Sequence, residues 1–348
     1  MPPVERGKST LAELGIPLTL APMAALPVAD LPKEPGWQFE PKWDGFRCLA
    51  FRAGREVEIK AKSGKSLSRF FPEVLDKLRA LANQHFVLDG ELVIPIEGEL
   101  SFDALQMRLH PAESRIRRLA QETPATFVAF DCLLHKPRQV LLEHSFEERR
   151  SVLEAFFARE HDGISLTPFT RNRRKATTWL ARRRLALDGV IAKRLDLPYK
   201  PAERAMLKVK CLRTADCVVG GFRYASSTHL VGSLLLGLYD NAGLLHHVGF
   251  TSAIADKDKP ALTARLEKLI APPGFTGDAP GGPSRWSTER SAEWQPLRPK
   301  LVVEIRYDHV TGHRFRHGTR LMRWRPDKSP RQCTVDQLAK PSAAVASL

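Results

Sequence analysis

Lys42 lies in a short run whose residue types suit attack on a phosphorus atom. A lysine amine attacks phosphorus only when it is neutral, which requires burial or a neighbouring positive charge. Lys42 precedes the apolar Trp43, and the cationic Arg47 follows nearby. Gly45 permits a sharp turn that would bring Asp44 and Arg47 to the same pocket. The run therefore suits a nucleophilic lysine, and it equally suits a surface strand and turn with a salt bridge.

Two carboxylates, Glu91 and Asp188, lie in or beside apolar stretches. Burying a carboxylate is costly unless a metal ion or a cationic side chain accompanies it. Lys208 and Lys210 alternate with apolar residues, so they share one face of a predicted strand. Their charges repel unless a phosphate lies between them or solvent surrounds the strand. Together with Lys42, these residues are the parts that phosphoryl-type transfer needs.

The elements around these residues mix strands and helices without a regular βαβ period, which favours an α+β domain. Alternating or apolar runs predict strands at 38–49 (with a turn), 57–62, 86–94 (interrupted at Gly90), 125–134, 188–193 and 205–210. Helical spacing predicts helices at 71–84, 102–120 (broken near Pro111) and 146–160. Residues 1–35 are expected to form an extended lead-in.

After residue 210 the pattern changes to short strands separated by Gly, Ser and Asn turns. We expect strands at 218–224, 233–239, 244–251 and 301–307, a helix at 259–270 and a linker at 271–284. This pattern predicts a small OB-fold, a β-barrel of the oligonucleotide-binding type. The boundary near residue 212 divides the chain into domains 1–212 and 213–348.

The charge balance points to a polyanionic partner. Fifty-four Lys and Arg oppose 39 Asp and Glu, which gives a formal charge of +15 and a sequence pI of about 9.8. Nucleic acid is therefore the first partner to consider. Five cysteines without CxxC spacing argue against a zinc ribbon or a disulfide framework. No signal pattern or apolar run of about 18 residues is present, which predicts a cytoplasmic protein without a membrane partner.

Several motifs in order resemble those of the covalent nucleotidyltransferases, the superfamily of ATP-dependent ligases and mRNA capping enzymes. Residues 42–47 (Lys-Trp-Asp-Gly-Phe-Arg) resemble its KxDGxR signature. The family's later motifs are resembled, in the same order, by residues 88–91, 127–131, 188–193, 207–210 and 316–328 of this chain. The two-domain length and the run 303–309 most resemble bacterial ATP-dependent DNA ligases of the C type and the ligase part of ligase D. The resemblance implies an adenylation domain followed by an OB-fold domain with a basic C-terminal motif.

The resemblance also implies a role for each matching residue. Lys42 would become adenylated by ATP, with Asp44 beside it, and Arg47 would contact the ribose or the nick phosphate. Glu91 and Asp188 would assist a magnesium or manganese ion, and Glu91 would also hold the ribose. Glu40, Phe130 and Val190 (or Ile191) would contact the nucleoside, Lys62 would meet a phosphate, and Lys208 and Lys210 would grip the α-phosphate. Arg323 and Lys328 would orient the pyrophosphate, and Lys193 is a further expected cofactor-binding residue.

Two positions depart from the family pattern. Asp188 stands where the family usually has glutamate, and its shorter side chain favours metal contact through water. Lys62 stands where the family often has arginine, and lysine cannot form the bidentate fork of arginine.

Three further signals bear on contact with nucleic acid. Seven basic residues against three acidic ones at 301–330, with aromatic residues interleaved, favour phosphate contact. The spacing of His309, His313 and His317 suits metal binding, but the Arg-rich surroundings favour a nucleic-acid-facing loop. The cluster Arg171, Arg173, Arg174, Lys175 and 182–184 suits DNA contact or an exposed helix surface equally.

The predicted protein is a monomeric ATP-dependent DNA ligase for nicked or broken duplex DNA, with a role in repair beside end-binding proteins. Its second domain would close over ATP and then grip DNA, with the hinge near residue 212. The alternatives are an RNA ligase, a capping-type enzyme that uses GTP, and a non-catalytic nucleic-acid-binding module.

Overall fold

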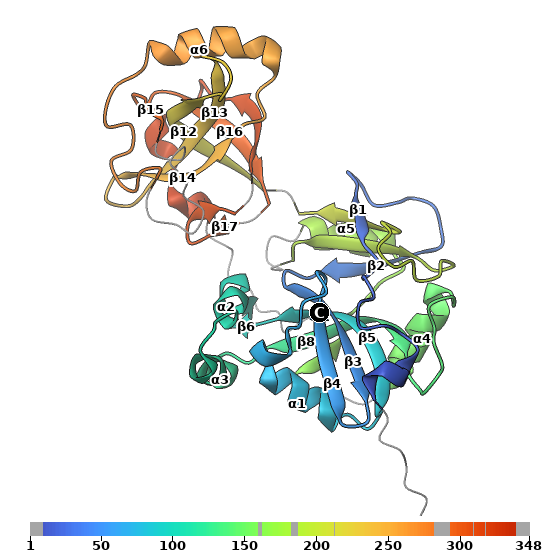
Figure 1. Ribbon diagram of the computed structural model, residues 1–348. Helices are drawn as coiled ribbons and strands as arrows, with labels where there is room; N and C mark the ends of the chain where they lie inside the picture. The colour runs from blue at the N-terminus through green and yellow to red at the C-terminus, as the bar shows by residue number, and fades with distance from the viewer. Residues whose placement is uncertain are drawn as a thin grey trace, which may run out of the picture. The chain divides into compact units, whose positions relative to one another are not determined.

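The chain forms two compact units, and the division falls between Cys211 and Leu212 (Figure 1). The computed structural model describes residues 10–158, 162–181, 187–211, 213–281, 293–308, 310–316 and 318–338. The expected hinge residue Leu212 and the arginines at 182–184 lie outside these residues, as do His309 and His317. Within the described ranges, no helix is both long and apolar enough to cross a membrane.

The first unit contains two principal sheets. One has the order β1 (Ala25–Pro27), β11 (Met206–Lys210), β10 (Gly189–Arg194) and β2 (Trp37–Lys42). The other has the order β4 (Glu56–Ala61), β3 (Phe46–Ala53), β5 (His85–Val93), β8 (Thr126–Leu134) and β9 (Ile164–Leu166). A short hairpin joins β6 (Pro95–Ile96) to β7 (Glu99–Leu100). The helices are α1 (Pro72–Ala80), α2 (Phe102–Arg108), α3 (Glu113–Glu122), α4 (Phe146–Phe156) and α5 (Arg173–Ala181).

Alternation along β2, β10 and β11 gives their sheet two different faces. The apolar face packs against α5 and carries Phe39, Val190, Ala192 and Val209, buried with Ala176 and Trp179. The opposite face carries Glu40, Lys42, Ile191, Lys193 and Lys208. Burial of the apolar side fixes the register, and the charged side chains therefore gather on the other side.

The larger sheet packs its apolar residues against α1 and α4. Leu88, Leu92 and Phe127 from the strands meet Leu78 of α1 and Leu153 of α4 in one buried cluster. Helix α4 begins at a capping box, in which the Ser145 hydroxyl accepts from the backbone N–H of Glu148 at 3.3 Å. The packing of α1 and α4 supports the sheet beneath the residues at the ends of β3, β5 and β8.

The second unit is a small OB-fold built on one six-stranded sheet. Strands β14 (Leu245–Thr251), β13 (Val231–Tyr239), β12 (Arg213–Tyr224), β16 (Val302–Tyr307) and β19 (Arg320–Trp324) follow in that order, and β15 (Gln295–Pro296) pairs with β12. Strands β17 (Val310–Thr311) and β18 (Arg314–Phe315) form a hairpin, and α6 is Lys259–Glu267. The sheet surrounds an apolar core that includes Phe222, Leu236 and Ile305.

Several predicted elements differ in extent from those observed. The predicted helix break near Pro111 is confirmed, because α2 ends at Arg108 and α3 begins at Glu113. The helix predicted at 71–84 ends at Ala80, and the helix predicted at 146–160 ends at Phe156. The described part of the predicted linker, 271–281, contains no helix or strand, and Phe275 within it is buried in the core of the second unit.

The predicted interruption of a strand at Gly90 is wrong. Strand β5 runs through Gly90, and only its pairing register with β8 shifts there. A Cβ atom at this position would lie 2.6 Å from Phe127 Cε2 and 2.6 Å from the carbonyl oxygen of Val128. Glycine is therefore required because β8 approaches too closely for a side chain.

We predict that Gly90→Ala lowers the free energy of unfolding by about 1–3 kcal/mol, because the added methyl overpacks the sheet. Urea denaturation of both proteins measures the difference. Gly318→Ala is the matched control, since a Cβ at Gly318 has no atom within 4 Å. Equal stabilities for the two variants would contradict the prediction.

Candidate functional site

A pocket in the first unit collects most of the residues selected from the sequence. Those that line it are Glu40, Lys42, Arg47, Lys62, Glu91, Phe130, Lys193 and Lys208. All of them except Lys62, which follows β4, come from strands of the two sheets. The segment 22–25 also lines the pocket. Sequence reasoning missed this segment, because its Pro- and Ala-rich composition carries no periodic or charged pattern.

Lys42 forms an ion pair with Asp188, and both residues belong to the first unit. The backbone supports this pair, since the Asp188 N–H donates to the Lys42 carbonyl oxygen at 3.0 Å. Gly189 pairs with Lys42 on one side and with Lys210 on the other. A Cβ at Gly189 would lie 2.9 Å from Lys210 Cα, so glycine permits the close approach of the strands that carry these charges.

Arg47 is held in one orientation by a fully buried carboxylate. Its Nε donates to Asp89 Oδ1 at 2.7 Å, and its Nη2 donates to Asp89 Oδ2 at 2.6 Å. Burial alone lowers the pKa of Arg47, but the Asp89 carboxylate outweighs it and raises that pKa above its ordinary value. The guanidinium carbon lies 4.5 Å from the centre of the Phe130 ring. Arg47 is therefore a fixed positive charge beside an aromatic wall.

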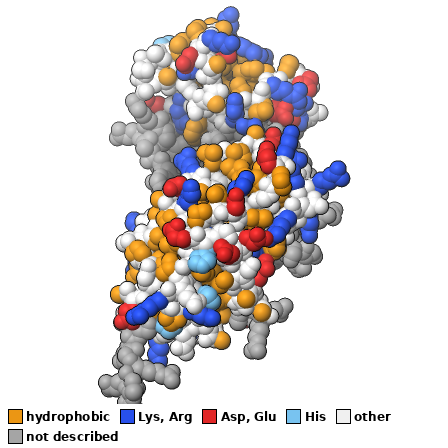
Figure 2. Space-filling model, turned by 90° about the vertical axis from the view of Figure 1, so that its right-hand side faces the viewer, with side chains coloured by type: hydrophobic (Ala, Val, Ile, Leu, Met, Phe, Trp, Pro, Cys, Tyr) orange, Lys and Arg blue, Asp and Glu red, His pale blue; other side chains and the backbone are white. Residues whose placement is uncertain are grey.

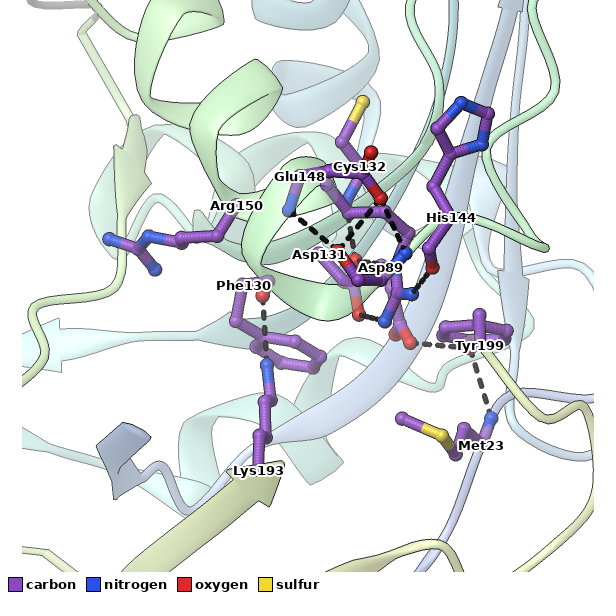
Figure 3. A network of polar contacts seen from close by, with 12 residues as sticks. Met23, Asp89, Phe130, Asp131, Cys132, His144, Glu148, Arg150, Lys193 and Tyr199 are labelled. Carbon is purple, nitrogen blue, oxygen red and sulfur yellow. Dashed lines mark hydrogen bonds and ion pairs between the residues drawn. The ribbon is translucent and has the colours of Figure 1, made fainter. Parts of the chain in front are cut away.

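Glu40 and Lys193 form a second fixed pair deeper in the pocket. Lys193 Nζ lies 2.8 Å from Glu40 Oε2 and donates to the Phe130 carbonyl oxygen at 2.8 Å. Figure 3 shows the Lys193 side chain directed toward Phe130. Burial lowers the pKa of Lys193, although the Glu40 charge opposes that effect. The pair joins β2, β8 and β10, so it fixes the aromatic ring relative to the charged sheet face.

The remaining charges are less compensated. Burial raises the pKa of Glu91 to about 7, although Arg47 and Lys42 oppose the rise. Burial, followed by the charges of Lys42, Lys210 and Lys62, lowers the pKa of Lys208. A pocket with repelling lysines and a carboxylate of raised pKa is suited to a ligand that carries both phosphate and a bound cation.

Four of the selected first-unit residues do not line the pocket: Asp44, Asp188, Val190 and Lys210. Val190 packs on the apolar face of its strand, and its neighbour Ile191 lines the pocket instead. The two-residue period could have shown this, because Ile191 shares a face with Lys193 and Val190 does not. Lys210 continues the cross-strand row of Lys42 and Gly189. Asp44 contributes to the electrostatic environment of Glu91.

Arg323 and Lys328 lie in the second unit, where carboxylates of that unit hold them. Arg323 Nε lies 2.6 Å from Glu304 Oε2, and Lys328 Nζ lies 2.7 Å from Asp216 Oδ2. Arg325 Nη1 also donates to Asp216 Oδ1 at 2.9 Å. The basic end of the chain is therefore fixed within its own unit by Asp216.

The described residues contain no group of three or more His, Cys, Asp or Glu that could hold a metal ion. Glu91 and Asp188 are the two carboxylates selected from the sequence for a metal role. Carboxylate oxygens are the ligand type that magnesium and manganese ions take, commonly one or two together with substrate phosphates. Of the three histidines in the predicted nucleic-acid-facing loop, His313 is described, and His309 and His317 lie outside the described residues.

A lysine paired with a carboxylate in a phosphate-suited pocket, on a chain that also contains an OB-fold, defines the site and fold of a covalent nucleotidyltransferase. Residues 22–210 match the ATP dependent DNA ligase domain, and residues 227–328 match the ATP dependent DNA ligase C terminal region. The chain belongs to the ATP-dependent DNA ligase family. This confirms the resemblance stated from the motifs.

Individual relatives agree with this assignment. The chain is 44% identical to DNA ligase C2 of Mycolicibacterium smegmatis, over 92% of this chain and 95% of the relative. It is 31% identical to the multifunctional non-homologous end joining DNA repair protein LigD of Mycobacterium tuberculosis, over 89% of this chain and 39% of the relative. A solved structure from work on Lig E DNA ligases has the same fold, with a TM-score of 0.53 at 16% identity, over 87% of this chain and all of the other.

We predict that Glu91→Gln changes how stability depends on pH. Below about 4.5, the usual pKa, Glu91 is protonated in both the folded and the unfolded chain. Between about 4.5 and about 7 only the unfolded chain loses the proton, so the carboxylate increasingly favours unfolding. The wild type should therefore lose stability relative to Glu91→Gln as the pH rises through this window.

Thermal unfolding of both proteins at several pH values measures this difference. Glu97→Gln is the control, because Glu97 is an exposed carboxylate outside the pocket. A difference that stays constant across the window would contradict the prediction.

Proposed function

We propose that this protein seals breaks with a 5′-phosphate and a 3′-hydroxyl in duplex DNA through a lysyl-AMP intermediate on Lys42. The observation that best supports the proposal is the position of Lys42, which lines the pocket and pairs with Asp188. Membership of the ATP-dependent DNA ligase family supplies ATP as the nucleotide.

The proposed reaction has three transfers of phosphorus. Lys42 Nζ forms a bond to the α-phosphorus of ATP while the bond from that phosphorus to pyrophosphate breaks. An oxygen of the DNA 5′-phosphate then takes the AMP, and the bond to Nζ breaks. Finally the 3′-hydroxyl oxygen bonds to the 5′-phosphorus, loses its proton and releases AMP. Asp188, already paired with Nζ, is the group that orients the lysine for the first transfer.

We assign the other residues from the motifs that they match and, for those that line the pocket, from their position in it. Glu91 and Asp188 would bind a magnesium or manganese ion, which supplies charge neutralisation for the phosphates when bound. Phe130 and Ile191 would flank the adenine, with Ile191 replacing the expected Val190 for the reason of strand alternation. The further proposed ligands of the nucleotide are Glu40, Asp44, Arg47, Lys62, Lys193, Lys208 and Lys210, with Arg323 and Lys328 for the pyrophosphate.

The DNA partner is supported by charge as well as by family. The chain carries a formal charge of +15. On the face shown in Figure 2, Lys and Arg side chains are interspersed with Asp and Glu over both units. We propose that residues 1–212 carry out adenylation, that residues 213–348 contribute to DNA binding, and that the protein acts in repair beside end-binding proteins. The name of the relative LigD, a non-homologous end joining protein, supports this pathway.

We predict that Lys42→Ala abolishes formation of a covalent AMP adduct, because no other amine takes its place at the α-phosphorus. Incubation with α-labelled ATP followed by denaturing electrophoresis detects the adduct. Lys65→Ala is the control, since Lys65 is exposed and does not line the pocket. A labelled Lys42→Ala protein would refute the assignment, and labelling by GTP in place of ATP would favour a capping-type enzyme.

We predict that the protein binds nicked duplex DNA with an affinity that falls steeply with salt. Each phosphate contact releases a counterion, so six contacts would weaken binding roughly 10³-fold between 50 and 200 mM salt. Fluorescence anisotropy of a labelled nicked duplex measures the slope, with an intact duplex as control. Sealing assays on DNA nicks, DNA ends and RNA-containing nicks then identify the substrate. Salt-independent binding would contradict the electrostatic part of the proposal, and preferential sealing of RNA would favour an RNA ligase.

A further inference from the structure

Tyr199 is a buried tyrosine that lies between the fourth and fifth motifs and has no assigned role. Only 3% of the residue is exposed. Its hydroxyl donates to Asp89 Oδ2 at 2.6 Å and accepts from the backbone N–H of Met23 at 2.9 Å. Figure 3 shows the hydroxyl between these two partners. Both capacities of the hydroxyl are therefore used inside the protein.

These bonds close a ring that includes Arg47. Asp89 accepts two bonds from the Arg47 guanidinium, at 2.7 and 2.6 Å. Arg47 Nη2 also donates to the carbonyl oxygen of Met23 at 3.1 Å. Met23 thus receives one bond from Arg47 and gives one to Tyr199. Because Arg47 and Met23 both line the pocket, the ring joins the pocket wall at 22–25 to the positive charge beside Phe130.

The surroundings keep the hydroxyl in its donor state. Burial and the neighbouring Asp89 charge raise the pKa of Tyr199 well above its ordinary value. Asp89 is fully buried, so each lost donor leaves carboxylate charge without compensation. The Arg149 guanidinium lies 5.6 Å from the centre of the Tyr199 ring, while its nitrogens donate to Asp131 at 2.8 and 3.0 Å. The ring of Tyr199 therefore has a contact, with Arg149, that does not involve the hydroxyl.

We propose that Tyr199 is a positioning residue whose hydroxyl sets Arg47 and the 22–25 wall of the pocket for nucleotide transfer. The inference rests on the proposed function, in which Arg47 contacts the ribose or the nick phosphate. Removal of the hydroxyl leaves the Met23 N–H without its acceptor and Asp89 without one of its donors. Arg47 keeps its charge and its pairing with Asp89, but the Asp89 carboxylate that orients it has lost one of its own anchors, so the Arg47–Asp89 pair is held less firmly.

Tyr199→Phe tests this role because it removes only the oxygen atom. Single-turnover formation of labelled lysyl-AMP, followed over a range of ATP concentrations, gives the maximal rate and the half-saturating ATP concentration. We expect the ratio of these two quantities to fall by about tenfold, as for loss of one buried hydrogen bond that acts on the transition state. Tyr239→Phe is the matched control, since Tyr239 is also buried below an arginine, Arg331, but lies in the second unit.

A double-mutant cycle separates positioning from general destabilisation. If Tyr199 acts through Arg47, then Tyr199→Phe should change the rate by less than about twofold in an Arg47→Lys background. Equal fold-losses in the two backgrounds, or wild-type kinetics for Tyr199→Phe, would overturn the inference. Both assays are run well below the unfolding temperatures of the variants, so a purely structural loss leaves the kinetics unchanged.

The two proposals fail in different ways. A wild-type protein that forms no lysyl-AMP with ATP would refute the proposed function. A wild-type protein that forms lysyl-AMP beside an unaffected Tyr199→Phe variant would refute only the role of Tyr199.

Discussion

The antiparallel register of β10 with β2 and β11 is the constraint on which the site depends. This register places Gly189 between Lys42 and Lys210, and Ile191 between Glu40 and Lys208. A slip of one residue would turn these charges into the apolar layer under α5 and would expose the apolar residues. The packing of Trp179 and its neighbours against that layer therefore determines where the lysines point. Burial of the apolar face of this sheet therefore keeps the charged side chains on the face that lines the pocket.

Charge compensation divides the pocket into fixed and adjustable groups. Asp89 with Arg47 and Glu40 with Lys193 are buried pairs with short hydrogen bonds, and breaking such a pair costs more than keeping it. Glu91 lacks an ion pair within the described residues, and burial raises its pKa to about 7. Lys208 lies among other lysines. The fixed pairs define the shape of the pocket. Of the less compensated groups, Lys208 suits a phosphate chain and Glu91 suits a cation.

Charge compensation also fixes basic side chains near the C-terminal end of the second unit. Asp216 holds Arg325 and Lys328 at 2.9 and 2.7 Å. A phosphate ligand that recruits Lys328 must therefore compete with Asp216, and the strength of that competition depends on how far the ligand excludes water. The OB-fold core behind these residues is apolar and continuous, so the basic end is presented on a rigid support.

The sequence by itself determined the class of chemistry, because Lys42, Arg47, Glu91, Asp188 and the pair Lys208 and Lys210 are local and ordered signals. It also indicated the mixed first unit and the short strands of the second, since the two-residue and helical periods are visible along the chain. Only the tertiary structure decided which residues meet. It paired Lys42 with Asp188, and it brought Met23 and Tyr199 to the Arg47–Asp89 pair. Such contacts join segments far apart in the chain, and no local spacing encodes the packing that brings them together.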